Sequence, residues 1–205
     1  MSIGLEVIRL MGDTVARDGM TIVEIGARSG GFSIFWAEIA LKYRAKLFCV
    51  DWFRGTDSEH VEATENDPEK YDGLAVRTEL RRALNGFGEC LDYYVLPFES
   101  AVAARLFDDY TVDIVFIDAE HVYDGVKRDL VTWMPKVRKG GVISGHDYEA
   151  KVTLDNLLWP VVVEHSHEGY TQDGLNWHCG VIRAVGEMFR PELINESQSI
   201  WWVCL

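Results

Sequence analysis

Five short runs of mainly apolar residues are spaced along the chain, and each ends in a turn of glycine, proline or acidic residues. Runs of this length, rich in β-branched and aromatic side chains, are typical of strands buried on both faces of a sheet. A sixth run, close to the C-terminus, alternates in character and suits an antiparallel strand at one edge. We therefore expect strands over residues 20–25, 46–51, 91–96, 112–118, 141–145 and 199–205.

Helical patterns separate these runs. Residues 32–43 are good helix formers, and residues 74–84 set leucines beside a basic face. Residues 123–137 repeat apolar side chains every three or four positions from Val126 to Val137, as on one face of a helix. Strands that alternate with helices predict an α/β fold with a mostly parallel sheet and right-handed crossovers.

Two segments are longer than connections usually need, and long loops of compact α/β domains are often functional. Residues 52–73 hold seven acidic residues between Asp57 and Asp72. They could form a lid or substrate wall, or simply a solvated loop. Residues 148–178 follow the fifth predicted strand and contain three histidines. Both segments are candidate lid or substrate segments.

Composition narrows the class of protein. The chain has 205 residues, 33 of them acidic and 20 basic, for a net charge of -13, and this length suits one domain over residues 1–205. The acidity argues against a nucleic-acid partner, because such affinity rests on clusters of basic residues. No stretch approaches the ~20 apolar residues of a membrane span, and no signal-peptide pattern opens the chain. We expect a cytoplasmic protein, without a membrane partner, whose four cysteines are free thiols.

Candidate chemistry begins where the first strand ends, because ligands of open α/β sheets bind at the carboxyl ends of the strands. Gly26, Gly30 and Gly31 allow a sharp backbone turn and a close approach to a ligand. The helix start at residues 32–33 could hold a carboxylate, although a plain strand-to-helix turn fits the same residues. Asp51, about 20 residues further on, suits a ribose diol, or else a helix cap or loop.

The run from Glu24 to Gly30 resembles the first motif of class I S-adenosylmethionine-dependent methyltransferases, and Asp51 resembles their ribose acid. Residues 116–130 and 133–148 resemble a subgroup that methylates hydroxyls of small molecules and sugars, such as macrolide and aminocoumarin sugars. The resemblance implies a Rossmann-like seven-stranded sheet, mostly parallel with strand seven antiparallel and helices on both faces. It implies S-adenosylmethionine as cofactor, a hydroxylated small-molecule acceptor, and cofactor contacts at Glu24, Gly26, Ser29, Gly30, Ser33, Asp51, Ser100 and Asp118. Ser100 could instead cap a helix.

Acidic and imidazole side chains meet after the fourth and fifth strands. Adjacent parallel strands lie ~5 Å apart, so Asp118, His146 and Asp147 could share one centre. Two carboxylates and an imidazole could hold a divalent cation, Mg²⁺ or a transition metal. The resembling enzymes usually carry two acids after strand five, and His146 departs from that pattern. The alternative is a metal-free site in which Asp118 contacts the cofactor and His146 positions the substrate.

His121 follows Asp118 by three residues and suits a general base for a hydroxyl group, because its pKa lies close to neutrality. Its alternative is a loop histidine bonded to backbone, and Glu120 could orient it or contact the methionine amino group. Two other functions stay open: a nicotinamide-dependent oxidoreductase, disfavoured by the missing G-x-G-x-x-G pattern, and a non-catalytic cofactor-binding module. The apolar end at residues 200–205 suggests an interface in a homo-oligomer.

Overall fold

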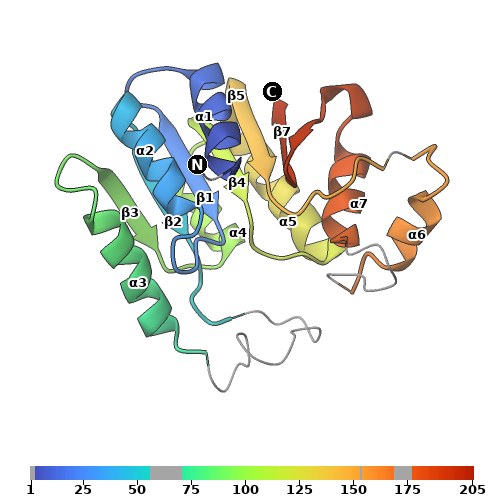
Figure 1. Ribbon diagram of the computed structural model, residues 1–205, viewed down its shortest axis with the longest axis horizontal. Helices are drawn as coiled ribbons and strands as arrows, with labels where there is room; N and C mark the ends of the chain where they lie inside the picture. The colour runs from blue at the N-terminus through green and yellow to red at the C-terminus, as the bar shows by residue number, and fades with distance from the viewer. Residues whose placement is uncertain (1–2, 56–70, 153, 169–176) are drawn as a thin grey trace.

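The computed structural model describes residues 3–55, 71–152, 154–168 and 177–205. Within these residues one sheet has the strand order β3-β2-β1-β4-β5-β7-β6 (Figure 1). The strands are β1 Thr21–Ile25, β2 Lys46–Val50, β3 Asp92–Leu96, β4 Val112–Ile117, β5 Val137–Gly145, β6 Asn195–Ser197 and β7 Ile200–Cys204. The α-helices are α1 Ile3–Val15, α2 Ser33–Tyr43, α3 Gly73–Asn85, α4 Ser100–Ala103, α5 Tyr123–Trp133, α6 Trp159–Glu164 and α7 Cys179–Met188.

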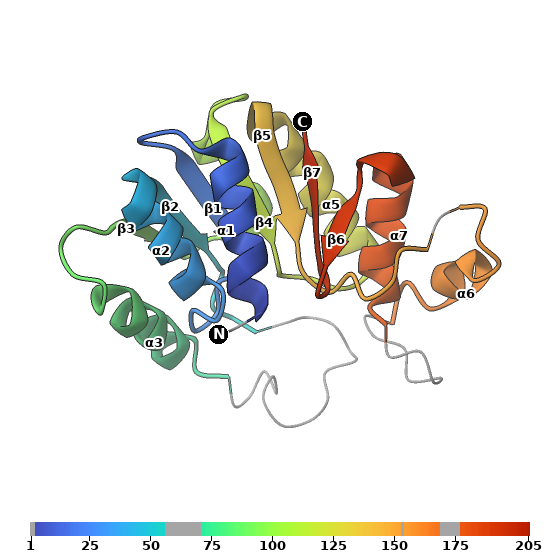
Figure 2. The ribbon, with the colours of Figure 1, turned by 45° about the horizontal axis from the view of Figure 1, so that its top comes forward.

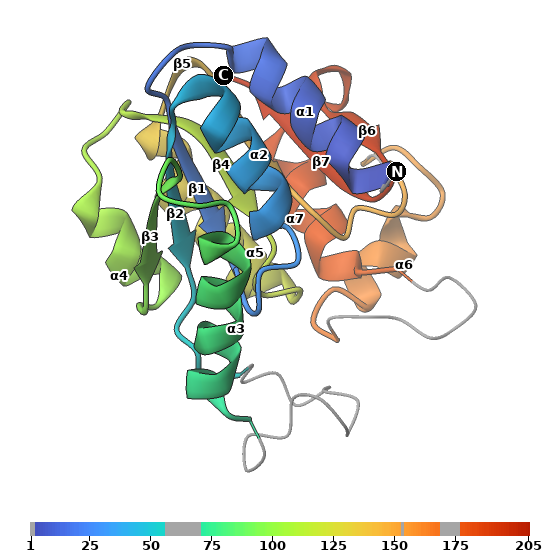
Figure 3. The same cartoon turned by 60° about the vertical axis from the view of Figure 1, so that its left-hand side comes forward.

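Helices cover both faces of the sheet. Alternate residues of each central strand point to opposite sides, and because most of them are apolar, both faces must be buried. Figure 3 shows α1 and α2 in front of the sheet with α5 and α7 behind it. Ile22 of β1 packs into the core under α1 and α2, whereas Val23 packs into the core under α5 and α7. Every residue of β4 is buried, as expected for the central strand of a layered α/β fold.

The strand order reverses next to β1, which pairs in parallel with β2 on one side and β4 on the other. Backbone bonds continue just past the strand ends: the amide of Asp118 donates to Ile25 and that of Gly26 donates to Val50. The loops that follow β1, β2 and β4 are therefore fixed side by side at the carboxyl edge of the sheet. This is the place where α/β folds bind their ligands.

The predicted fold class is confirmed, including the antiparallel β7, which pairs with β5 (Figure 2). One helix boundary was wrong: the helical pattern stops at Trp133, because Pro135 lacks the amide that an α-helix needs, and Val137 pairs with Val112 in the sheet. The edge position predicted for residues 199–205 is also corrected, whereas the homo-oligomer stays a prediction. β7 lies between β5 and β6, so the apolar side chains of Ile200, Trp201 and Val203 belong to the core.

The sheet is anchored at its opposite edge by a buried acid. The Asp113 side chain accepts hydrogen bonds from Arg17 at 2.7 and 2.9 Å, from Arg138 at 2.5 Å and from the amide of Thr21 at 2.7 Å. Burial raises the pKa of Asp113, but the hydrogen bonds from the two guanidinium groups and the amide lower it by more than burial raises it. The pKa of Asp113 is therefore below its usual value.

Among the described helices, none combines the length and the apolarity that a membrane crossing requires.

Candidate active site

Gly26 lets the loops after β1 and β4 touch. Its φ of +89° lies in the left-handed region, and a Cβ atom at this position would stand 2.0 Å from the carbonyl oxygen of Asp118. Only glycine fits both conditions. The predicted glycine turn is thus a point of contact between the ends of β1 and β4. Gly31, in the same turn, has no such contact, since a Cβ atom built on it would meet no atom within 4 Å.

Glu24 and Ser33 form a buried pair beneath this turn. Glu24 is 1% exposed, Ser33 is fully buried, and the Ser33 hydroxyl donates a short hydrogen bond to the Glu24 carboxyl group. Burial raises the pKa of Glu24 to about 8, with a smaller contribution from the charge of Asp118. Both side chains therefore hold the first turn of α2 on β1, and neither is displayed at the surface of the turn.

Asp51 ties the turn to the end of β2. Its carboxylate accepts hydrogen bonds from the amide of Arg28 at 2.9 Å and from the amide of Phe53 at 2.6 Å. Burial raises the pKa of Asp51, and these two amides oppose the shift. The structure thus places the predicted ribose acid beside the glycine turn. Each carboxylate oxygen accepts one hydrogen bond from a backbone amide and has a further lone pair that can accept another.

The two remaining serines differ in exposure. Ser29 is exposed in the glycine turn, between Arg28 and Gly30. Ser100 is the first residue of α4, whose cap position belongs to Glu99, so the capping alternative for Ser100 is wrong. Its hydroxyl instead accepts a hydrogen bond from the indole of Trp133 at 2.9 Å.

The three residues predicted to share a metal centre lie together. His146 Nδ1 is 2.9 Å from Asp147 Oδ1 and 3.7 Å from Asp118 Oδ1, and one ligand atom from each of the three lies within 4.8 Å of the others. Burial raises the pKa of Asp118 to about 6, and repulsion from Asp147 adds to the shift. Asp147 has a φ of +60°, unfavourable for a residue with a side chain, so the surrounding structure holds it in place.

His121 joins this cluster through Asp147. Its Nε2 lies 2.8 Å from Asp147 Oδ2, which leaves Asp147 between two imidazoles. Burial alone would raise the pKa of Asp147, but hydrogen bonds from His121 and His146 lower it well below its usual range. Burial conversely lowers the pKa of His121, and the bond to Asp147 reverses that shift and raises it. Glu120 accepts a hydrogen bond from the backbone amide of His121 at 3.0 Å, so it orients the loop rather than the ring.

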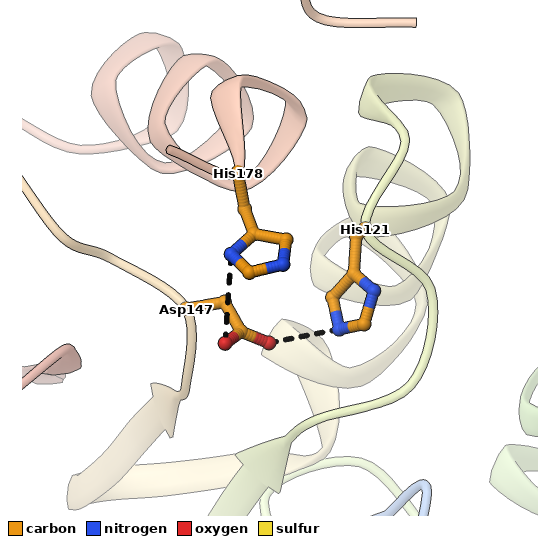
Figure 4. Close-up of side chains that lie close together, drawn as sticks. All are labelled: His121, Asp147 and His178. Carbon is orange, nitrogen blue, oxygen red and sulfur yellow. Dashed lines mark ion pairs between the residues drawn. The ribbon is translucent and has the colours of Figure 1, made fainter. Parts of the chain in front are cut away.

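Sequence reasoning missed two members of the cluster, His178 and Glu149. Figure 4 shows His178, directly before α7, next to His121 and directed at the same Asp147 carboxylate. Its Nδ1 lies 3.6 Å from Asp147 Oδ1 and 2.5 Å from Glu149 Oε1, and the His121 and His178 ring centroids are 4.7 Å apart. The only available signal was the accumulation of histidines in residues 148–178, which singled out none of them.

Gly180 explains how His178 reaches this position. A Cβ atom on Gly180 would stand 2.1 Å from the carbonyl oxygen of His121, so α7 begins in direct contact with the loop that carries His121. Tyr123, the first residue of α5, contacts two residues further along α7. Its hydroxyl donates to Glu187 at 2.6 Å, and its ring centroid lies 3.8 Å from the guanidinium carbon of Arg183. These contacts fix α7 against α5.

A pocket opens between the cluster and the core. It is lined by Asp118, His121, His146 and Asp147 on its polar side and by apolar residues that include Val126, Val181 and Trp201. Phe32, directly before α2, packs against His146 with ring centroids 5.0 Å apart and the ring planes tilted by 54°. The glycine turn and the charged cluster are therefore neighbours.

Of the two long segments, residues 56–70, 153 and 169–176 lie outside the described residues, so their predicted roles as lid or substrate segments stay predictions.

An α/β sheet with this order and a ligand edge built from a glycine turn, a strand-end acid and a polar pocket defines a class of nucleoside-cofactor enzymes. The family model of a methyltransferase domain matches residues 23–148, more than half of the chain. The chain therefore belongs to the methyltransferase domain family. This membership decides against the nicotinamide-dependent oxidoreductase and the non-catalytic module, and it identifies an S-adenosylmethionine-dependent methyltransferase.

Solved structures agree with this assignment at the level of the fold. The calicheamicin methyltransferase CalS11 is 15% identical with a TM-score of 0.64, over 98% of this chain and 78% of that one. The O-methyltransferase NovP is 19% identical with a TM-score of 0.59, over the same shares of 98% and 78%. An rRNA methylase from Streptococcus thermophilus is 8% identical with a TM-score of 0.55, over 100% and 96%. No curated protein matches the chain in sequence.

Proposed function

We propose that residues 1–205 act as one domain that methylates a hydroxyl group of a small molecule or sugar. The observation that carries this proposal is the adjacency of the glycine turn at Gly26 and the polar pocket at His121, joined by the contact of Gly26 with Asp118. A cofactor held at the first and an acceptor held in the second would meet at the same strand ends. CalS11, described as a TDP-rhamnose 3'-O-methyltransferase, supplies an example of such an acceptor on this fold, and NovP is described as an O-methyltransferase.

The chain's own residues fit S-adenosylmethionine, which supplies a sulfonium methyl group when bound. Gly26 and Gly30 keep the turn free of side chains, and Asp51 presents carboxylate oxygens to a ribose diol beside it. The backbone at Ser29 and Ser33 faces the methionine end, with Glu24 holding Ser33 from below. Ser100 is proposed on the adenine side, and Asp118 at the methyl-bearing end.

His121 is the proposed general base. Asp147 lies 2.8 Å from its Nε2 and fixes the orientation of the ring, as the carboxylate of a catalytic dyad does. The bound cofactor would supply its sulfonium methyl group to the acceptor oxygen, and His121 would take up the hydroxyl proton. Positioning supplies most of the rate, and the proton transfer contributes roughly 10²–10⁴-fold.

A divalent cation such as Mg²⁺ is also proposed, with Asp118, His146 and Asp147 as the residues that would hold it. Their donor atoms lie within 4.8 Å of one another, and carboxylate oxygens suit a hard cation. The chemistry that it would supply is polarisation of the acceptor hydroxyl. Nucleic acid is not proposed as an acceptor: the fold also occurs in rRNA methylases, but the net charge of -13 opposes phosphate binding.

The test begins with cofactor binding measured by calorimetry for S-adenosylhomocysteine and NAD. Asp51→Ala should weaken binding of S-adenosylhomocysteine roughly 10- to 100-fold, the worth of hydrogen bonds to a charged group. Asp108→Ala, an exposed acid before β4 at the other edge of the sheet, is the matched control and should change nothing. Transfer of a labelled methyl group to hydroxylated sugar nucleotides and catechols then defines the acceptor. Unchanged affinity in Asp51→Ala would refute the ribose assignment, and exclusive methylation of RNA would refute the acceptor class.

A further inference from the structure

We infer that His121, Asp147 and His178 form a second cation site, distinct from the Asp118, His146 and Asp147 group and selective for a divalent transition metal. The inference goes beyond the proposed reaction and depends only on the positions of these side chains. The donor atoms of the three residues lie within 4.8 Å of one another. They come from three separate parts of the chain: the loop after β4, the loop after β5 and the start of α7.

The distances suit coordination. Ligand atoms about 2.1 Å from one cation lie about 3 to 3.5 Å from each other. His121 Nε2 stands 2.8 Å from Asp147 Oδ2, and His178 Nδ1 stands 3.6 Å from Asp147 Oδ1. Small rotations of the rings would therefore bring all three ligand atoms onto one ion. Figure 4 shows both imidazoles directed at the same carboxylate.

The chemistry of the donors selects the cation. Two imidazoles and one carboxylate favour iron, cobalt, zinc and related ions, whereas Mg²⁺ prefers oxygen donors. Glu149 lies beside the site, with its Oε1 2.5 Å from His178 Nδ1, at hydrogen-bond distance. Its second oxygen accepts the backbone amide of His178 at 3.0 Å, which fixes Glu149 at the helix start. Two imidazole nitrogens and one carboxylate oxygen are also the protein donor set of several catalytic zinc sites.

Asp147 is shared by the two sites. Its Oδ2 faces His121, while its Oδ1 faces both His146 and His178. One carboxylate can bridge two ions, and paired metal sites are commonly separated by about 3.5–4 Å. An ion bound to His121 Nε2 leaves the ring proton on Nδ1, the nitrogen that would otherwise accept the hydroxyl proton. Occupation of this site and the role of His121 as a base therefore exclude each other.

The test uses Co²⁺ as the probe, because its visible absorption reports nitrogen and oxygen ligands directly. The full chain, stripped with a chelator, is titrated with Co²⁺ and followed by absorption and calorimetry. The wild type should bind Co²⁺ with an absorption band that Zn²⁺ abolishes and Mg²⁺ does not. His178→Ala should weaken binding at least about 100-fold, since losing even an outer partner of a metal ligand costs 10–100-fold.

Three variants complete the design. His167→Ala is the matched control, because His167 is an exposed histidine in the same segment of residues 148–178 as His178. This variant should bind Co²⁺ as the wild type does. Asp118→Asn should keep the Co²⁺ band, because Asp118 belongs to the neighbouring group. His178→Asn, with melting temperatures for all variants, guards against misfolding. Binding unchanged in both His178 variants, or lost in Asp118→Asn alone, would overturn the inference. Neither outcome bears on the transferase assays.

Discussion

Glu24 allows a stability prediction that can be worked out from the structure. The carboxyl group is 1% exposed, and burial raises its pKa from 4.5 to about 8. The unfolded chain therefore releases this proton at lower pH than the native protein does, and stability falls as pH rises between these values. One pKa unit corresponds to about 1.36 kcal/mol, so the full shift corresponds to about 5 kcal/mol.

The perturbation is Glu24→Gln, a neutral side chain of similar shape that can still bond to Ser33. Between about pH 6 and pH 9 the wild type should lose about 2.5 kcal/mol of stability relative to this variant. Glu24 is already ionised in the unfolded chain at pH 6, and about two pKa units remain before it ionises in the native protein. Other ionisable groups are present in both proteins and cancel in the difference. The variant should therefore be the more stable protein at alkaline pH.

The assay is urea unfolding followed by tryptophan fluorescence across that pH range, with the difference in unfolding free energy plotted against pH. Glu79→Gln, an exposed glutamate on α3, is the matched control and should run parallel to the wild type. Parallel curves for Glu24→Gln and the wild type would refute the reasoning, because they would mean that Glu24 titrates alike in the native and unfolded chains.

Two further predictions test how the ends of the strands are held. Asp113→Ala should cost about 1–3 kcal/mol in urea unfolding, because the amide of Thr21 and the partly exposed guanidinium groups of Arg17 and Arg138 lose their acceptor. Folded protein should still bind S-adenosylhomocysteine normally, and a loss below 1 kcal/mol would contradict this prediction. Gly180→Ala should abolish Co²⁺ binding while sparing cofactor affinity, because its new methyl group would displace α7 from the carbonyl of His121; retained Co²⁺ binding would show that this contact does not set the position of His178.

Most of the sheet was predictable because its strands carry their burial in their own sequence. Every residue of β4 is buried, so the run at residues 112–118 is almost continuously apolar and needs no partner to be recognised. α1 was missed although the signal existed: Leu5, Ile8, Met11 and Val15 are buried at spacings of three or four. β6, three polar residues at the edge, carries no such signal and exists only because β7 pairs with it.

The site divides in the same way. Gly26, Asp51 and Asp118 stand directly after strands, so strand prediction alone locates them at one edge of the sheet. The sequence does not show that Glu24 is neutral or that Ser33 faces inward, since both depend on how α2 packs over β1. Local patterns can place a residue at a strand end, but they do not reveal which neighbour it meets there.

His178 shows where prediction from local pattern stops. It lies about 30 residues beyond Asp147 in sequence, and its approach depends on α7 packing against α5 and on the absence of a side chain at Gly180. That contact converts a carboxylate between two imidazoles, His121 and His146, into one surrounded by three. In the inferred site of His121, Asp147 and His178, this second imidazole would favour a transition metal over Mg²⁺. The cation preference of that site would therefore depend on helix packing, and substitutions at the α5 and α7 contact should alter metal preference without altering cofactor binding.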